Sequence, residues 1–120
     1  MKVRNYTEVL PDTDLPDGAL RTAITAEEAP RFSMRGFEVA IGSSKPLHTH
    51  EWEREVFVLS ESGQVYGDEG ERPLSVNDVV IVPPGEEHRF TSTGDGICCF
   101  ICCILNSAQS APVESTDCDG

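Results

Sequence analysis

Residues 42–59 read GSSKPLHTHEWEREVFVL, and this stretch is the most informative part of the sequence for the fold. Its two histidines, His48 and His50, are two positions apart. On an extended chain, residues at this spacing project from the same face, with backbone positions roughly 6.5 to 7 Å apart. That span lets both imidazoles reach one ion through bonds of about 2 Å. We therefore predict that this stretch carries part of a metal site on a strand.

The remaining histidine lies in a second short motif, PPGEEH, at residues 83–88. Pro83 fixes its own φ and Gly85 permits a left-handed residue, so the motif predicts a rigid corner. His88 is then expected at the start of the following strand. Neutral imidazole suits zinc, copper, iron and nickel, and an oxygen-rich remainder would tolerate manganese. We expect a divalent first-row transition metal ion as cofactor, with the candidate ligands His48, His50 and His88.

Outside these motifs the chain consists of short runs rich in β-branched and aromatic residues, separated by Gly, Pro, Asp or Asn. Short strands at close spacing are typical of an all-β barrel or sandwich. The candidate helix at residues 25–29 spans barely a turn and meets Pro30. The predicted strands cover residues 32–41, 47–50, 55–59, 64–66, 78–82, 88–91 and 97–105.

A chain of 120 residues supports one compact domain. We expect residues 1–30 to form an edge strand followed by irregular chain that wraps the domain, because prolines remove donors from a strand ladder. Residues 31–106 are expected to form the barrel. Residues 107–120 lack any apolar period, so we expect a disordered acidic tail.

The chain is strongly acidic, with nine basic and 21 acidic residues and a net charge of −12. Such a surface repels phosphate backbones and anionic lipid, which disfavours nucleic-acid and membrane partners. No stretch approaches the roughly 20 apolar residues that span a bilayer, and the amino terminus shows no apolar signal core. We expect a cytoplasmic protein.

Cysteine is also informative, because Cys98, Cys99, Cys102 and Cys103 crowd into one apolar run while Cys118 lies in the polar tail. An odd number of clustered thiols is a poor disulfide framework and fits a reducing compartment. The spacing of Cys99 and Cys102 raises zinc or redox chemistry as an alternative. On a strand, however, an offset of three points side chains to opposite faces. We interpret the run as small buried hydrophobes.

The two histidine motifs resemble the two cupin motifs, the first at residues 42–50 and the second at residues 83–88. The runs MRGFEV, HTHEWEREVFVL and DVVIVPPGEEHRF extend the match, so that residues 29–105 resemble the small bacterial single-domain cupins of the RmlC-like superfamily. The resemblance implies a double-stranded β-helix, the cupin jelly-roll barrel, which is usually a homodimer and holds a metal ion inside. It also implies the ligand positions of the histidines, which fall on His48, His50 and His88.

The resemblance also implies a fourth ligand, a Glu or in some small members a His, which follows the second histidine after three or four intervening residues. An ungapped alignment places Arg54 there, and Arg54 cannot ligate because it has no lone pair to donate. A register with one more residue places Glu55 there instead. The hydrophobic alternation that follows does not decide, since both faces are apolar. Position 61, where small members usually carry a glycine, favours the ungapped register, but both stay open.

The same reasoning predicts what lines the cavity. Side chains two apart share a face, so an inward His88 places Phe90 beside it. The resemblance turns Phe100 and Cys102 of the last strand inward, although packing explains each of them equally well. Guanidinium groups bind carboxylates through paired hydrogen bonds. The candidate substrate-binding residues are therefore Arg35, Arg54, Phe90, Phe100 and Cys102.

Fold resemblance suggests several functions and does not choose between them. One expectation is a metal-dependent, dioxygenase-like oxidoreductase acting on a small organic acid or phenolic compound. Another is a non-enzymatic module that binds a small ligand or a metal, and a third is a cupin isomerase or lyase. In each case the expected partner is a small molecule, together with a second copy of the chain.

Overall fold

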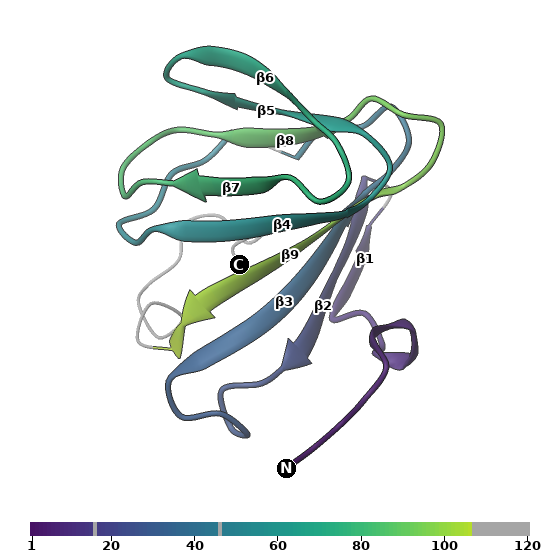
Figure 1. Ribbon diagram of the computed structural model, residues 1–120, viewed down its shortest axis with the longest axis vertical. Helices are drawn as coiled ribbons and strands as arrows, with labels where there is room; N and C mark the ends of the chain where they lie inside the picture. The colour runs from purple at the N-terminus through teal and green to yellow at the C-terminus, as the bar shows by residue number, and fades with distance from the viewer. Residues whose placement is uncertain (16, 46, 107–120) are drawn as a thin grey trace.

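The fold consists of two antiparallel β-sheets. The structure is a computed structural model, and it describes residues 1–15, 17–45 and 47–106. One sheet has six strands in the order β1, β2, β3, β9, β4, β7, and the other has three in the order β6, β5, β8 (Figure 1). In this part of the chain no helix combines the length and hydrophobicity needed to cross a membrane. The predicted tail at 107–120, with Cys118, lies outside the described residues. The strands are β1 (Thr13–Leu15), β2 (Gly18–Ile24), β3 (Phe32–Val39), β4 (Arg54–Ser60), β5 (Gly63–Gly67), β6 (Gly70–Leu74), β7 (Val79–Val82), β8 (Arg89–Ser92) and β9 (Cys98–Leu105).

The expectation of an all-β jelly roll is confirmed, and β9 is its central strand. It pairs with β3 along its whole length, from Phe32 opposite Leu105 to Val39 opposite Cys98, and with β4 on its other side. Side chains along β9 alternate between the two faces of the sheet, so Cys102 is buried between the sheets. Cys99 projects from the outer face, where its Sγ lies 3.8 Å from the hydroxyl of Tyr6.

The amino-terminal thirty residues contain more regular structure than the sequence suggested. They hold a 3₁₀ turn, η1 (Tyr6–Glu8), and the strands β1 and β2. β2 pairs with β3 from Gly18 opposite Val39 to Ile24 opposite Met34. The pattern of β2 is hard to recognise because its two fully buried residues are alanines, which carry a weak hydrophobic signal.

One predicted strand is absent from the structure, and one observed strand was not predicted. The predicted strand at 47–50 is wrong: these residues form no named strand and make one isolated bridge, between His48 and His88. Conversely, β6 was not predicted, because its sequence GERPL carries charged residues and Pro73. A proline is tolerated there because β6 is an edge strand, paired only with β5.

The core fills the space between the sheets around three phenylalanines with no exposed surface. The rings of Phe37 and Phe100 stack with their centroids 5.0 Å apart. Phe90, from the other sheet, lies 5.5 Å from Phe37 and 4.9 Å from Phe100. Such contacts join the two sheets, and aromatic pairs add to the free energy gained from apolar burial.

Candidate metal centre

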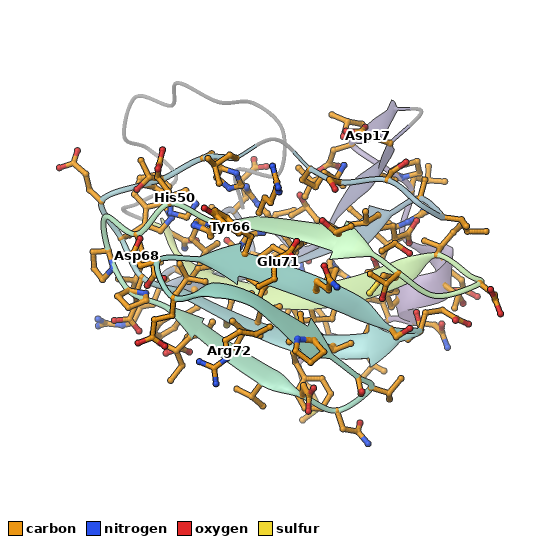
Figure 2. All side chains as sticks on the ribbon, turned by 90° about the horizontal axis from the view of Figure 1, so that it is seen from above. Asp17, His50, Tyr66, Asp68, Glu71 and Arg72 are labelled. Carbon is orange, nitrogen blue, oxygen red and sulfur yellow. The ribbon has the colours of Figure 1, made fainter. Side chains whose placement is uncertain are left out.

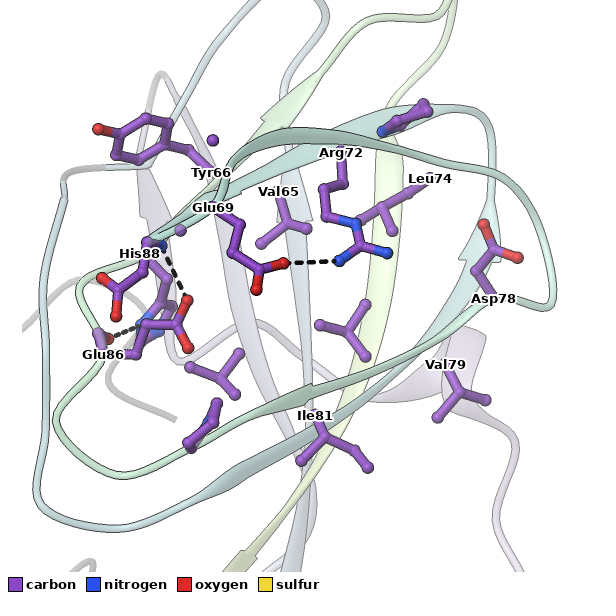
Figure 3. Close-up of a pocket in the computed structure, with 17 residues that line it drawn as sticks. Val65, Tyr66, Glu69, Arg72, Leu74, Asp78, Val79, Ile81, Glu86 and His88 are labelled. Carbon is purple, nitrogen blue, oxygen red and sulfur yellow. Dashed lines mark hydrogen bonds and ion pairs between the residues drawn. The ribbon is translucent and has the colours of Figure 1, made fainter.

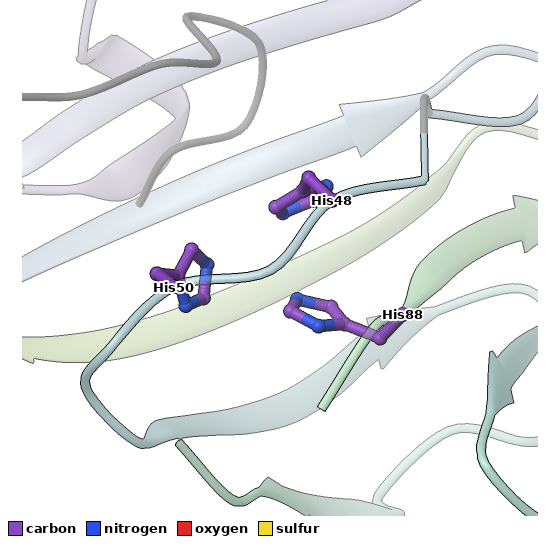
Figure 4. A group of neighbouring side chains, drawn as sticks. All are labelled: His48, His50 and His88. Atoms are coloured by element: carbon purple, nitrogen blue, oxygen red, sulfur yellow. The ribbon is translucent and has the colours of Figure 1, made fainter. Parts of the chain in front are cut away.

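Three imidazole rings meet at one end of the space between the sheets (Figure 4). The potential ligand atoms of His48, His50 and His88 all lie within 4.8 Å of one another. The ring centroids are 4.5 Å apart for His48 and His88, 5.0 Å for His50 and His88, and 5.2 Å for His48 and His50. The structure thus brings together the three candidate ligands from two distant segments.

Backbone hydrogen bonds clamp these two segments together. The amide of His48 donates to the carbonyl of His88 at 3.1 Å, and the amide of His88 donates back at 2.9 Å. The amide of Gly85 donates to the carbonyl of His50 at 2.8 Å. Gly85 has a φ of +84°, a conformation that favours glycine, so the predicted corner is present before His88. The positions of the imidazoles therefore depend on backbone geometry on both sides.

The rings are also oriented. The Nδ1 atom of His88 lies 2.9 Å from the carbonyl of Glu86, so Nδ1 donates and Nε2 is left as the acceptor. The ring of His50 stacks on Trp52, with centroids 4.8 Å apart and planes at 5°. Sequence reasoning missed Trp52, although its position two residues after His50 was the signal that could have identified it.

Burial favours the neutral form of two of the three imidazoles, those of His50 and His88. His48 and His88 are 8% and 1% exposed. Burial is the main cause that lowers the pKa of His50 and of His88 from 6.5 to about 4, and the nearby charge of Arg54 lowers both further. At neutral pH both rings are therefore uncharged, which is the form that binds metal.

Arg54 and Glu55 point in opposite directions. Arg54 is 1% exposed, whereas Glu55 projects into solvent on the outer face of β4. The Nη1 atom of Arg54 lies 3.5 Å from Nε2 of His48, and its Cζ atom lies 4.4 Å from the ring centroid of Phe37. Of the two registers left open by the sequence, the structure has the one that turns Arg54 inward.

The backbone at position 61 agrees with this register. Glu61 occupies the position seven residues beyond Arg54 and has a φ of +64°. This left-handed conformation favours glycine, which is the residue expected there. The loop carboxylates are not directed inward either, since Glu51 and Glu53 are exposed like Glu55.

The remaining candidate residues also lie between the sheets. Arg35 is partly buried and stands opposite Cys102 in the pairing of β3 with β9, so the two side chains share the inner face. The Sγ atom of Cys102 is 3.9 Å from Nη2 of Arg54. The ring of Phe90 lies 6.2 Å from that of His88, and Phe100 packs deeper, in the aromatic core.

A cavity of about 560 Å³ opens between the β5–β6 hairpin and β7, and His88 is part of its lining (Figure 3). Its apolar walls come from both sheets, while Arg72 and Glu69 form an ion pair at 3.5 Å. Asp68, which also lines the cavity, lies toward the same end of the molecule as His50 (Figure 2). The cavity therefore connects solvent with the neighbourhood of the imidazoles; its apolar lining includes Val65, Leu74, Val80 and Val82.

The donor set fits a transition metal ion. The Nε2 atoms of His50 and His88 are buried and have no hydrogen-bond partner among the described residues. A buried polar atom without a partner costs about 1–3 kcal/mol, so it needs another explanation. A metal ion that accepts the lone pairs of both Nε2 atoms provides such an explanation. Zinc, copper, iron and nickel all bind imidazole nitrogen.

Comparisons with known proteins give consistent results. The sequence model of the Cupin_2 family, described as Cupin domain, matches residues 36–104. The solved structure of the polyketide cyclase RemF from Streptomyces resistomycificus has a TM-score of 0.78 and 28% identity over 88% of this chain and 79% of that one. No curated protein matches the chain in sequence.

Two further solved structures are similar. A cupin 2 domain-containing protein from Halorhodospira halophila has a TM-score of 0.67 and 30% identity, over 72% of this chain and 62% of that one. A protein from Thermotoga maritima, described as a predicted oxalate decarboxylase, has a TM-score of 0.75 and 23% identity, over 87% of this chain and 98% of that one. At that identity the likeness concerns the fold alone.

Proposed function

This chain belongs to the cupin family, and from that premise we propose that it holds a divalent first-row transition metal ion on His48, His50 and His88. The observation that carries the proposal is the meeting of three imidazoles, two buried and one partly buried, whose potential ligand atoms lie within 4.8 Å of one another. Iron, manganese, nickel, zinc and copper all suit such a donor set, and the supply of metal often decides among them.

The reaction we propose is a dioxygenase-like oxidation of a small organic acid or phenolic compound, in which dioxygen supplies both oxygen atoms. A bound ion supplies Lewis acidity and, when it is redox-active, electron exchange. The three imidazoles act as neutral donors, and Arg54 takes the place of a fourth protein ligand. Arg35 and Arg54 suit the carboxylate of a substrate, and Phe90 and the cavity walls suit its apolar part.

A non-enzymatic module that binds a small ligand or a metal is the second candidate. The observation that favours it is the Arg54 guanidinium, 3.5 Å from Nε2 of His48, because a cation there weakens metal binding. A third class is a cyclase, isomerase or lyase, supported by the likeness to the polyketide cyclase RemF.

Metal analysis and oxygen uptake test these proposals. We expect the purified protein to carry stoichiometric metal and to lose it in His48→Ala and His88→Ala, while far-UV circular dichroism shows an unchanged fold. Thr49→Ala, an exposed change between two ligands, is the matched control and should keep the metal. Unchanged metal content in either histidine variant would refute the site. Oxygen uptake that depends on an added organic acid supports the oxidoreductase, whereas bound ligand without turnover supports the binding module.

We also propose that the protein is a homodimer in the cytoplasm. The outer face of β4 and β7 exposes apolar side chains, with Val79 and Ile81 67% and 68% exposed, and the partly exposed Phe57 lies next to Val79. The thiols of the four described cysteines are free, as a reducing compartment favours. Sedimentation should give a dimer that Ile81→Glu dissociates, and a wild-type monomer would contradict the assembly.

A further inference from the structure

We propose that Arg54 links metal loading of this site to the binding of a small oxyanion, such as a carboxylate, between the two sheets. The inference rests on the proposed metal function and adds a requirement to it: the site takes up metal and acid together. Three observations support it, namely the contact of Arg54 with a candidate ligand, its burial, and the second arginine on the same inner face.

The first step is a competition for one lone pair. Arginine has only donors, so at 3.5 Å its Nη1 donates to Nε2 of His48. A neutral imidazole nitrogen that accepts a hydrogen bond uses the same lone pair that a metal ion needs. An ion on His48 therefore displaces the N–H of Arg54 from this lone pair.

The second step concerns charge. The guanidinium of Arg54 is always protonated, is 1% exposed and lies against the ring of Phe37. A divalent ion on the neighbouring imidazoles adds positive charge in a region of low dielectric constant, where like charges repel more strongly than in water. The carboxylates of Glu51, Glu53 and Glu55 are exposed, so solvent screens them from this region. An anion next to Arg54 would reduce the repulsion.

The third step identifies the chemistry of that anion. Arg35 and Arg54 both project from the inner face, with Cys102 opposite the first and 3.9 Å from Nη2 of the second. Two guanidinium groups suit an oxyanion with at least two acceptor oxygens, since planar guanidinium pairs with carboxylate in a forked geometry. Val82, which stands opposite Arg54 in the pairing of β4 with β7, lines the 560 Å³ cavity together with His88. The cavity thus reaches His88 and a residue that neighbours Arg54 on the adjacent strand.

Linkage then follows from thermodynamics. If the anion binds more tightly when metal is present, the metal binds more tightly when the anion is present, by the same factor. In this arrangement Arg54 lowers the metal affinity of the anion-free site and raises it again once an acid engages the guanidinium. The site would therefore bind metal more weakly in the absence of a suitable acid than in its presence.

The test is a competition titration with zinc, in acetate or in perchlorate at equal ionic strength. Acetate supplies two acceptor oxygens, and perchlorate is a weak acceptor. We expect wild-type protein to bind zinc about 5-fold to 150-fold more tightly in acetate, the usual range of coupling between sites. We expect Arg54→Met to bind zinc more tightly than wild type in perchlorate and to show no effect of acetate. Arg31→Met, which removes an exposed arginine, is the matched control and should behave like wild type.

Each outcome has a defined meaning. Equal zinc affinity of the wild type in both anions would overturn the linkage while leaving the metal site intact, and so would an Arg54→Met variant with the acetate dependence of wild type. Absence of zinc binding in the wild type and in Arg54→Met, under both conditions, would overturn the metal function and the linkage with it. If Arg54→Met does not fold, Arg54→Lys replaces it: we expect a zinc affinity as low as that of wild type in perchlorate, with a smaller gain in acetate, because the point charge remains and the fork is lost.

Discussion

The interior has two ends that are chemically unlike. We call the group His48, His50, His88 and Arg54 the polar end, and the group Phe37, Val58, Phe90 and Phe100 the apolar end. Most of these side chains are buried, with Arg54 and His88 each 1% exposed and the three phenylalanines 0%, whereas His50 is partly exposed. One strand, β4, runs from Arg54 at one end to Val58 at the other, so the chemistry changes within four residues. The two ends therefore differ in the types of side chain that they contain more than in the depth of their burial.

The two ends also differ in what supports them. The apolar end is carried by strands, and its side chains follow the regular alternation of β3, β8 and β9. The imidazoles of the polar end come from residues 42–50 and from the corner at 83–88, outside the named strands. Binding residues on loops that a rigid sheet positions are common in proteins, because loop sequence can change without loss of the core. Here the apolar end stabilises the fold that holds the polar end in place.

The largest predicted effect is at the apolar end. Phe100→Ala should lower the free energy of unfolding by about 3–5 kcal/mol, because the ring is fully buried and its loss leaves a cavity between Phe37 and Phe90. Urea unfolding of the metal-free protein measures it. Phe32→Ala is the control, since this ring is 54% exposed, and should cost less than about 1 kcal/mol. A loss for Phe100→Ala no larger than that of the control would mean that the aromatic cluster is not the main stabilising contact.

The polar end should make the metal-free protein sensitive to acid. The pKa of His50 and of His88 is 6.5 when exposed and about 4 in the fold. Between these pH values the unfolded chain binds more protons than the folded chain. The free energy of unfolding therefore falls as the pH falls from 6.5 to 4, whereas the contribution of these two histidines stays constant above pH 6.5. We expect a loss of roughly 2 kcal/mol in total, after allowing for partial solvent screening.

Urea unfolding across this pH range, in the presence of a chelator, is the measurement. His88→Gln removes one of the two groups and should show about half the loss between pH 6.5 and pH 4. An identical loss in wild type and His88→Gln would show that His88 does not titrate with a lowered pKa. Stability that rises toward pH 4 would contradict the sign of the prediction for both histidines.

Short-range spacing predicted where each candidate ligand lies in its own segment, and the resemblance to the two cupin motifs predicted that the segments meet. Two histidines two apart share a face, and a Pro and Gly corner fixes the third. The register of β4 was not predictable in this way. Its outer face carries Phe57 and Leu59, which are apolar although 41% and 40% exposed, so both faces of the strand look like a core face. The direction of Arg54 depends on pairing with β7 and β9, which no local pattern contains.

The strands that the sequence missed or did not locate are the edge strands β1 and β6 and the interior strand β2. β2 buries only alanines, and β6 carries charged residues and Pro73, so neither shows a run of large apolar side chains. In contrast, the central strands β3 and β9 were predicted nearly to their ends. The edge strands β7 and β8 were also predicted to within one residue, so edge position alone does not explain what was missed.

A smaller effect is expected where β4 ends beside the apolar end. Glu61→Gly should raise the free energy of unfolding by about 0.5–1 kcal/mol, because a φ of +64° strains a residue with a Cβ atom and suits glycine. Urea unfolding measures the change. Ser62→Gly is the matched control, since Ser62 does not have a positive φ, and should lower the stability instead. A loss of stability in Glu61→Gly as large as in Ser62→Gly would contradict the left-handed conformation at position 61.

The smallest effect is expected for Glu55→Gln, and it bears most directly on the difference between the ends. Glu55 projects outward, and its pKa is raised by a hydrogen bond with Glu53, not by any group of the polar end. Removing its charge should therefore change zinc affinity less than about twofold, whereas Arg54→Met should change it clearly, because only Arg54 contacts a candidate ligand. A tenfold loss of zinc affinity in Glu55→Gln would mean that Glu55 turns inward when metal binds. The polar end would then be an ordinary four-ligand site, and the guanidinium would lie there only in the metal-free protein.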